Sequence, residues 1–425
     1  MRPREIFKNK LLKNALIIVS GSGTAQAITL LASPIITRLY DPKEFGALGS
    51  FMALAAVLLP LATMSLSMAV VLPRRKSTAI SLIHFSLFHC LLSSLLLLGL
   101  WSIDHQILLK YFSLDSLEYI QFLFPLYLLS TGAVEVFSFW MVRNKNFMLR
   151  AKVVFFQSLL SNSLKILVGL FAGFQSSLIV ITLFTSLVTG LLYLYFFRNS
   201  LFSKNYAFKK SSHTRAIYSK YIDFLRFRTP QRLLVGLNQS LPILLMTYYF
   251  DLASAGFFTL CRTVLMMPLS LIATSLSDVL YPDIKERINE GRPVSNLILK
   301  STLALSLLSF LPFSFIFFYG KELFSFVFGD GWAQAGLYSE WFVIWIFFNF
   351  INRPSVAAVS FFKFEKSLLL NSSLNSVLIV FAFYFASTIG NDITAIAMYS
   401  IVCVIPQIII MFGVYNRSKK ILQFR

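Results

Sequence analysis

Four charged side chains fall inside long apolar stretches of the sequence: Glu135, Lys165, Arg262 and Arg353. An ionised group within a bilayer is costly, so each of these residues must face a partner, water or a ligand. Cations outnumber acids among them, which favours an anionic ligand. Arginine can hold a phosphate through two parallel hydrogen bonds, and lysine can add a point charge. These residues predict a site for a phosphate-bearing ligand inside the membrane.

Two of these cations, Arg262 and Lys165, are candidate ligand contacts with clear structural alternatives. Arg262 lies near the outer end of its apolar stretch, from which its long side chain could instead reach the interface. Lys165 shares a helix face with Ser158 and Asn162. An ion pair between Lys165 and Glu135 of the preceding helix would satisfy both charges without any ligand.

Arg353 ends a stripe of residues at helical i, i+4 spacing, formed by Trp341, Trp345, Asn349 and Arg353. A helix face with tryptophan, asparagine and arginine does not suit lipid. It is typical of a wet cavity that holds sugar and phosphate. Asn375 gives the following helix a similar face, which polar contacts between helices explain equally well. We take Asn349, Arg353 and Asn375 as candidate substrate contacts.

The stretch ITRLYDPKEFGALG places several charges at the end of the first apolar stretch. Asp41 and Pro42 form a helix start, with the aspartate at the N-cap and the proline at the first helical position. Arg38 precedes this start. It is a candidate contact for phosphate or a lipid headgroup at the outer exit, and anchoring in the interface is the alternative.

Two acidic residues, Glu135 and Asp278, are candidates for ion coupling. Asp278 lies near the inner end of its apolar stretch, where interfacial anchoring is the alternative. The sequence holds no Walker loop, Ser-His-Asp set or HExxH motif, so the motor is not ATP hydrolysis in this chain. The three cysteines lie in apolar runs and the four histidines are scattered. We therefore expect no metal, no disulfide framework and no cofactor.

The composition indicates the elements that must position these residues. The chain has 425 residues, of which 57% are hydrophobic and 13% are charged, against roughly 25% charged in soluble domains. Apolar runs of helix-spanning length recur throughout, which predicts an all-α polytopic membrane protein. The sequence predicts about twelve transmembrane helices, at residues 14–37, 45–70, 79–100, 119–141, 153–172, 177–197, 232–250, 255–278, 296–318, 337–360, 368–388 and 394–414.

The distribution of the 38 lysines and arginines supports this count and fixes the orientation. If the N-terminus is cytoplasmic, most of them fall in cytoplasmic segments. The opposite side receives Arg38, Lys43, Lys110 and Lys321. This bias follows the positive-inside rule and places both termini in the cytoplasm. The net charge of +20 is therefore a sign of topology and of contact with anionic membrane lipids, not of nucleic-acid binding.

An internal repeat divides the chain into halves. Residues from Pro34 onwards match residues from Pro242 onwards at a nearly constant offset, with Asp251 at the place of Asp41 and Gly256 at that of Gly46. We expect an N-terminal six-helix lobe over 1–200, a basic cytoplasmic linker over 201–231 and a C-terminal six-helix lobe over 232–425. Such parallel repeats place a substrate cavity between two pseudo-two-fold related lobes that open alternately to either side.

Three stretches carry a resemblance to a known family: ASPIITRLYDPKEFG at 32–46, AVVLPRRK at 69–76, and the segment from Asn238 to Ile272. The sequence resembles the Wzx-type flippases of O-antigen and related polysaccharide units, within the multidrug/oligosaccharidyl-lipid/polysaccharide exporter superfamily. In this resemblance Arg262 matches the arginine of helix eight, and Arg38 matches the arginine that ends helix one. The chain departs at Ser65 and Ser67, where relatives often carry arginine and glutamate.

The resemblance implies a flippase that moves an undecaprenyl-diphosphate-linked oligosaccharide across the bacterial inner membrane by alternating access through a cationic cavity. Other polysaccharide-assembly membrane proteins are possible partners. The main alternative is a drug or cation antiporter of the same superfamily, which would need an acidic site that helix one lacks. A membrane glycan polymerase is a further alternative, which the absence of a large outer loop disfavours. Export of a finished polysaccharide stays open.

Overall fold

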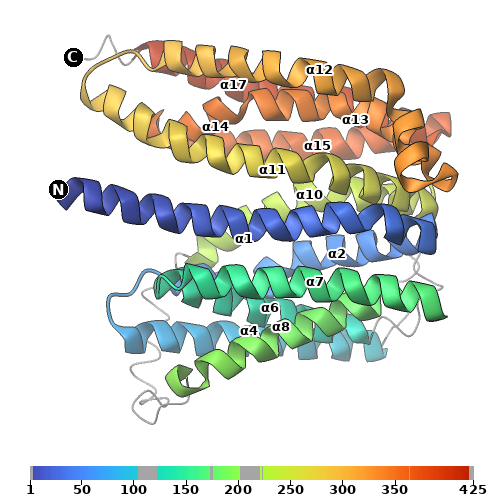
Figure 1. The fold of residues 1–425 in the computed structure, drawn as a ribbon, viewed down its shortest axis with the longest axis horizontal. Coiled ribbons are helices and arrows are strands. Elements are labelled where there is room, and N and C mark those ends of the chain that lie inside the picture. The colour runs from blue at the N-terminus through green and yellow to red at the C-terminus, as the bar shows by residue number, and fades with distance from the viewer. Residues whose placement is uncertain are drawn as a thin grey trace. The chain divides into compact units, whose positions relative to one another are not determined.

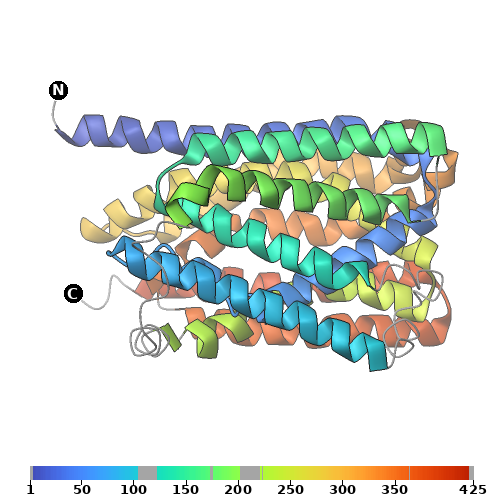
Figure 2. The ribbon, with the colours of Figure 1, turned by 90° about the horizontal axis from the view of Figure 1, so that it is seen from below.

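The computed structural model describes residues 3–103, 122–172, 176–201, 221–222, 224–362 and 364–420, and the regular secondary structure of these residues is helical. The first half contains α1 (Pro3–Leu39), α2 (Pro42–Ala62), α3 (Leu66–Ala69), α4 (Lys76–Ile103), α6 (Leu123–Arg143), α7 (Phe147–Ala172) and α8 (Ser177–Leu201). The second half contains α10 (Thr229–Tyr249), α11 (Leu252–Asn289), α12 (Ser295–Phe328), α13 (Ala333–Ile351), α14 (Arg353–Ala358), α15 (Glu365–Ile389), α16 (Asp392–Val402) and α17 (Val404–Lys420). Figures 1 and 2 show these helices in two views.

The prediction of an all-α polytopic membrane protein is confirmed. Within the described residues, ten helical segments are long and apolar enough to cross a membrane. The predicted spans at 14–37 and 232–250 correspond to α1 and α10, which are not among the ten. With 37 and 21 residues, both are long enough to span. α10 is more polar, with Asn238 in its middle, and the side chains of the first half of α1 lie outside the described residues, so the count of twelve spans stays a prediction.

The chain forms two compact units. Unit 1 comprises residues 1–40 and 47–240, and unit 2 comprises residues 41–46 and 241–425. One boundary falls in the connection between α1 and α2, and the other two fall inside α2 and α10. The division of the sequence into two six-helix lobes and a linker stays a prediction.

Three predicted single helices are broken. The span predicted at 45–70 is divided by Met64 and Ser65, which have φ angles of 49° and 51°, into α2 and α3. The span predicted at 337–360 is interrupted at Asn352, between α13 and α14, and the last span at Cys403, between α16 and α17. Prolines lie near each break, at Pro60, Pro354 and Pro406. A proline lacks the amide hydrogen of a continuous helix, which permits such interruptions.

In unit 1, α1 and α7 lie side by side along their length (Figures 1 and 2). Their contact is polar: Ser158 donates to the carbonyl of Ala25 at 2.8 Å, and Asn162 donates to Thr29 Oγ1 at 3.1 Å. The face of α7 that carries Ser158 and Asn162 therefore binds α1. Side-chain hydrogen bonds of this kind hold helices together where the surrounding lipid is as apolar as the side chains.

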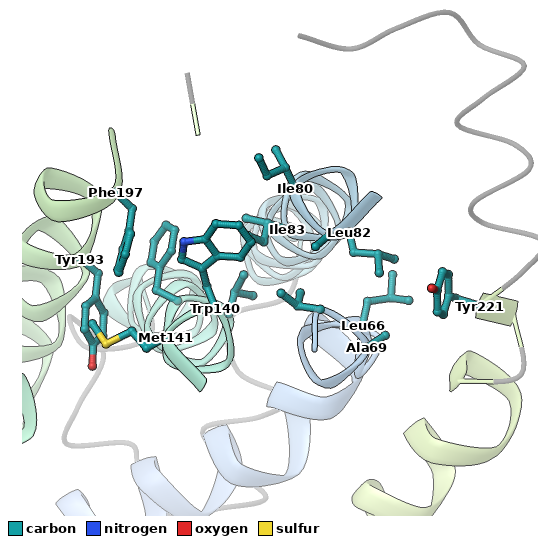
Figure 3. Close-up of a cluster of buried hydrophobic side chains, with 14 of the residues drawn as sticks. Leu66, Ala69, Ile80, Leu82, Ile83, Trp140, Met141, Tyr193, Phe197 and Tyr221 are labelled. Carbon is teal, nitrogen blue, oxygen red and sulfur yellow. The ribbon is translucent and has the colours of Figure 1, made fainter. Parts of the chain in front are cut away.

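The main buried cluster of unit 1 joins α3, α4, α6 and α8. Figure 3 shows Trp140 of α6 at its centre, with Phe197 and Tyr193 of α8 on one side and Ile83 of α4 on the other. All are large side chains with little or no exposure. Arg143, at the end of α6, donates to the carbonyls of Val70 and Arg74 and so fixes the AVVLPRRK turn to the same helix.

In unit 2, two glycines lie where the backbones of α12 and α13 approach each other closely. A Cβ atom at Gly336 would lie 2.5 Å from the carbonyl oxygen of Gly320, and one at Gly320 would lie 2.8 Å from that of Gly336. The start of α11 is capped by Asp251, whose carboxylate accepts from the amide of Ser254 at 2.6 Å. The small residues thus allow the close helix approach that is typical of membrane bundles. The cap satisfies a backbone amide at the start of α11.

The repeated glycines Gly46 and Gly256 meet within unit 2. A Cβ at Gly46 would lie 1.7 Å from the carbonyl oxygen of Leu252, and a Cβ at Gly256 would lie 1.8 Å from that of Pro42. Each glycine thus packs on the backbone four residues before the other. This reciprocity is what a duplicated hairpin predicts, because repeat-related positions then make the same contact twice.

We expect Gly46→Ala and Gly256→Ala each to destabilise the protein by more than about 3 kcal/mol, because a backbone oxygen cannot move away as a flexible side chain would. The measurement is the midpoint of thermal unfolding in detergent, together with the yield of monodisperse protein. Gly99→Ala is the control, since a Cβ at Gly99 meets no atom within 4 Å. An alanine at position 46 or 256 that unfolds like the Gly99 variant would contradict this interpretation of the contact.

Candidate functional site

Glu135 of α6 forms an ion pair with Arg232, in the first turn of α10. The two guanidinium nitrogens lie 2.8 and 3.1 Å from the two carboxylate oxygens, and Ser67 of α3 also donates to the carboxylate. The side chains of Arg232 and Glu135 are only 27% and 13% exposed. The counter-ion of Glu135 is therefore Arg232. The alternative considered from the sequence, an ion pair between Glu135 and Lys165, is wrong.

Sequence reasoning missed Arg232 because it falls at the edge of a predicted span, where a basic residue reads as a topology signal. The short helix α3 explains why the pair forms. Because the chain breaks at Met64 and Ser65, it turns Ser67 towards Glu135. Ser65 and Ser67 are the positions at which the sequence departs from the family that it resembles. The carboxylate and the guanidinium of this ion pair come from α6 and α10.

Lys165 of α7 is half-buried, and among the described residues its amino group has no ion-pair or hydrogen-bond partner. Its backbone carbonyl accepts a hydrogen bond of 2.7 Å from the hydroxyl of Tyr40. The neighbouring polar residues Ser158 and Asn162 are occupied by α1. The ammonium of Lys165 is therefore available for another role.

Arg262 lies half-buried on α11, one helical turn after Phe258, whose ring contacts that of Tyr399 on α16. Tyr399 belongs to an aromatic cluster with Phe258, Phe342 and Trp345. The rings of Phe342 and Trp345 are stacked, with centroids 5.3 Å apart and an interplanar angle of 13°. Unit 2 therefore places an arginine beside a stack of aromatic rings inside apolar helices.

The predicted stripe on α13 is continuous across the break at Asn352. The guanidinium of Arg353 donates to Asn349 Oδ1 at 2.6 Å, so these two candidates share a face as their spacing predicted. At the break, the side-chain amide of Asn352 donates to Gln407 Oε1 of α17 at 2.8 Å and so connects this position to α17. Asn352 and Gln407 were not predicted, because a helix break cannot be located from periodicity alone.

The other candidates are less constrained. Arg38 lies exposed in the last turn of α1, and Asn375 lies half-buried on α15. The side chain of Asp278 lies outside the described residues, although its backbone belongs to α11. Their functional roles stay predictions.

A second carboxylate that sequence reasoning missed is Asp392, at the start of α16. It accepts hydrogen bonds from Tyr338 and Gln334 of α13 and from Ser254 of α11, the last at 3.2 Å. Three helices of unit 2 are thereby joined at one acid. Because its oxygens are satisfied by neutral donors, Asp392 is a structural centre. No cluster of three or more His, Cys, Asp or Glu side chains that could hold a metal occurs among the residues described.

We expect Glu135→Gln to destabilise the protein by roughly 3 kcal/mol, because it leaves the guanidinium of Arg232 without its counter-charge. Exchanging the two residues, Glu135→Arg with Arg232→Glu, should restore part of the loss. Arg292→Gln is the control, since the Arg292–Glu290 pair is about half exposed and should contribute less than about 1 kcal/mol. Thermal unfolding of the four proteins in detergent measures the effect, and equal midpoints would show that the pair is not structural.

Comparisons with known proteins agree with this architecture. A multidrug resistance MATE family transporter of the MOP superfamily, in an inward-facing conformation, shares the fold with a TM-score of 0.67 at 14% identity, over 96% of this chain and 99% of the other. A MOP superfamily transporter from Pyrococcus furiosus, described as having a binding pocket of reverse polarity, matches with a TM-score of 0.59 at 14% identity, over 96% of each chain. The lipid II flippase MurJ matches with a TM-score of 0.59 at 13% identity, over 98% of this chain and 90% of that one.

These structures show that the chain shares the fold of the multidrug transporter and of the lipid II flippase. No curated protein matches the sequence. The sequence profile of one family, described as polysaccharide biosynthesis protein, matches residues 35–336. The chain therefore belongs to the polysaccharide biosynthesis protein family.

Proposed function

We propose that this protein is a flippase for an oligosaccharide linked to a polyprenyl diphosphate, such as undecaprenyl diphosphate. The O-antigen repeat unit and related polysaccharide units are the substrates that we infer. The protein would act in the bacterial inner membrane with both termini in the cytoplasm. Two six-helix lobes would expose a cationic cavity alternately to either side, while the polyprenyl tail stays in lipid.

The observation that carries this proposal is the position of Arg262 on α11, one turn after Phe258 of the aromatic cluster of unit 2. A guanidinium can hold a diphosphate through parallel hydrogen bonds, and this grip is stronger where water is scarce. Aromatic side chains offer an apolar body for sugar rings with polar tips for their hydroxyls. A cation next to aromatic rings thus fits a ligand that joins a diphosphate to a sugar.

Family membership supports a flippase over a drug antiporter, whereas the fold is found in transporters of both kinds. Family membership links the chain to polysaccharide biosynthesis, and one structure with this fold is a lipid II flippase. Among the described in-span charges, cations predominate, which disfavours a cationic drug. Lys165, Arg353 and Arg38 are further candidate substrate contacts under this proposal, with Asn349 and Asn375 as polar ones. Anionic lipids at the basic cytoplasmic segments, and other polysaccharide-assembly membrane proteins, are the expected partners.

Glu135 is the candidate for ion coupling that the structure describes best. Its carboxylate faces Arg232 of α10 and Ser67 of α3. Protonation of Glu135 would break its pair with Arg232 and release the start of α10 from unit 1. Because α10 continues into unit 2, this release offers a route from proton binding to lobe movement. Asp278 remains the second candidate.

Arg262→Ala should abolish surface glycan while the amount of protein in the membrane is unchanged, because the diphosphate loses its guanidinium. Arg262→Lys should restore only part of the activity, since an ammonium cannot form the two parallel hydrogen bonds. The measurement is surface glycan in a deletion strain that expresses each variant. Substrate on the inner leaflet of that strain is quantified in parallel and should accumulate. Normal surface glycan with Arg262→Ala would sink the proposal.

If Glu135 couples transport to protons, Glu135→Gln should make flipping insensitive to an imposed pH gradient. Proteoliposomes with a fluorescent lipid-linked oligosaccharide report the rate with and without the gradient. Ser67→Ala is the matched control, because it removes one hydrogen bond to the same carboxylate but leaves it able to ionise. A gradient response that survives in the Glu135 variant would rule out this residue as the coupling group.

A further inference from the structure

Two hydrogen-bond donors on the α13–α14 stripe are buried without an acceptor. The indole Nε1 of Trp345 and the guanidinium Nε of Arg353 have no hydrogen-bond partner within the described part of the chain. Both groups can only donate. Buried polar groups in folded proteins are satisfied in the great majority of cases. A partner that satisfies either of these two groups would have to supply a hydrogen-bond acceptor.

Arg353 also lacks a counter-charge. The ion pairs of the described residues are Glu135–Arg232 and Glu290–Arg292, so no described carboxylate pairs with Arg353. Its guanidinium is held in place by a neutral group, Asn349 Oδ1, at 2.6 Å. This arrangement orients the arginine without neutralising it. An intramembrane cation that is fixed in direction but not compensated is suited to bind an external anion.

The surroundings of Trp345 distinguish it from a core tryptophan. The Nε1 of Trp140 in unit 1 also lacks a partner, but Trp140 is fully buried in an apolar cluster (Figure 3). Trp345 is half-buried, stacks on Phe342, and shares its helix face with Asn349 and Arg353. An aromatic ring in line with polar groups is a surface on which a sugar ring can lie.

The stripe is long enough for more than one group of a ligand. Eight residues separate Trp345 from Arg353, which corresponds to about 12 Å along a helix. Trp345 contacts the ring of Tyr399, which also contacts the ring of Phe258, one turn before Arg262 on α11. The order along unit 2 is thus Arg262, the aromatic cluster, Asn349 and Arg353. A ligand with its diphosphate at Arg262 would present its sugars to Trp345 and a more distant group to Arg353.

We propose that Trp345 and Arg353 form a glycan subsite for an oligosaccharide that carries a carboxylate. Trp345 stacks on a sugar ring and donates its indole hydrogen to a sugar oxygen. Arg353 binds the carboxylate with the donors that Asn349 leaves available. This inference rests on the proposed flippase function and narrows it, because it predicts an acidic repeat unit rather than a neutral one.

The test compares binding of a short uronic-acid-containing oligosaccharide with binding of its carboxyl-reduced, neutral counterpart. The full-length protein is studied in nanodiscs of zwitterionic lipid by calorimetry. We expect the acidic glycan to bind the wild type at least tenfold more tightly. Arg353→Gln should abolish this preference and Arg353→Lys should retain part of it. Trp345→Phe should weaken both glycans several-fold without changing the preference, because it removes the donor but keeps an aromatic ring.

Trp140→Phe is the matched control, since it removes an equally unpartnered indole hydrogen from the apolar cluster of unit 1 and should leave binding unchanged. Equal binding of the two glycans to the wild type would overturn the inference, as would an unchanged preference in Arg353→Gln. A preference lost when anionic phospholipid is added to the nanodiscs would assign Arg353 to a lipid headgroup and also overturn it.

The surface-glycan assay separates this inference from the flippase proposal. If Arg262→Ala abolishes surface glycan while Arg353→Gln binds both glycans as the wild type does, the flippase proposal stands and the acidic subsite is wrong. If Arg262→Ala has normal surface glycan, the flippase proposal fails whatever Arg353 binds. Each variant is first checked for a monodisperse elution profile, and Arg353→Lys, which keeps the charge, serves where Arg353→Gln does not fold.

Discussion

The cost of an ionised group in hydrocarbon is the constraint on which this structure depends. Each in-span charge must be compensated by the protein, by water or by a ligand. The charges of Glu135 and Arg232 compensate each other. The break before α3 allows Ser67 to donate to the same carboxylate. The start of α10 lies where Arg232 can reach Glu135 of α6. Arg353 shows the other solution, because it is oriented by a neutral amide and is not neutralised.

Helix breaks are the means by which these polar groups reach their positions. A continuous membrane helix satisfies its own backbone and presents side chains at a fixed period. The breaks at 64–65 and 352 each free the chain to place a polar residue, Ser67 in one case and Asn352 in the other, in contact with another helix. Discontinuous helices near binding sites are a recurring feature of transporters. In this protein one break directly precedes Arg353, and the other places Ser67 against Glu135. Both charged residues are candidates that the sequence analysis identified.

Much of the fold was predictable because hydrophobicity and charge obey strong rules in membranes. Long apolar stretches predicted the helices, and i, i+4 spacing predicted that Asn349 and Arg353 share a face. Pairing between distant segments was not predictable in this way. Lys165 and Arg232 were both available to Glu135, and the choice depends on the break before Ser67, which comes from the left-handed backbone of Met64 and Ser65. A left-handed backbone at two residues does not change the hydrophobic periodicity of a sequence, so periodicity could not predict this break.

The repeat shows which features a duplicated fold must keep and which can diverge. The glycines at 46 and 256 are retained in both copies, since either backbone contact fails if a side chain is added. Charges are not retained: Arg38 has Met246 as its counterpart in the aligned repeat. An anion that approaches Arg232 must compete with Glu135, whereas no described carboxylate competes for Arg353. Because release of a bound carboxylate opposes anion binding, the uncompensated arginine offers the more favourable site, and the two halves of one fold can take different parts in handling a charged ligand.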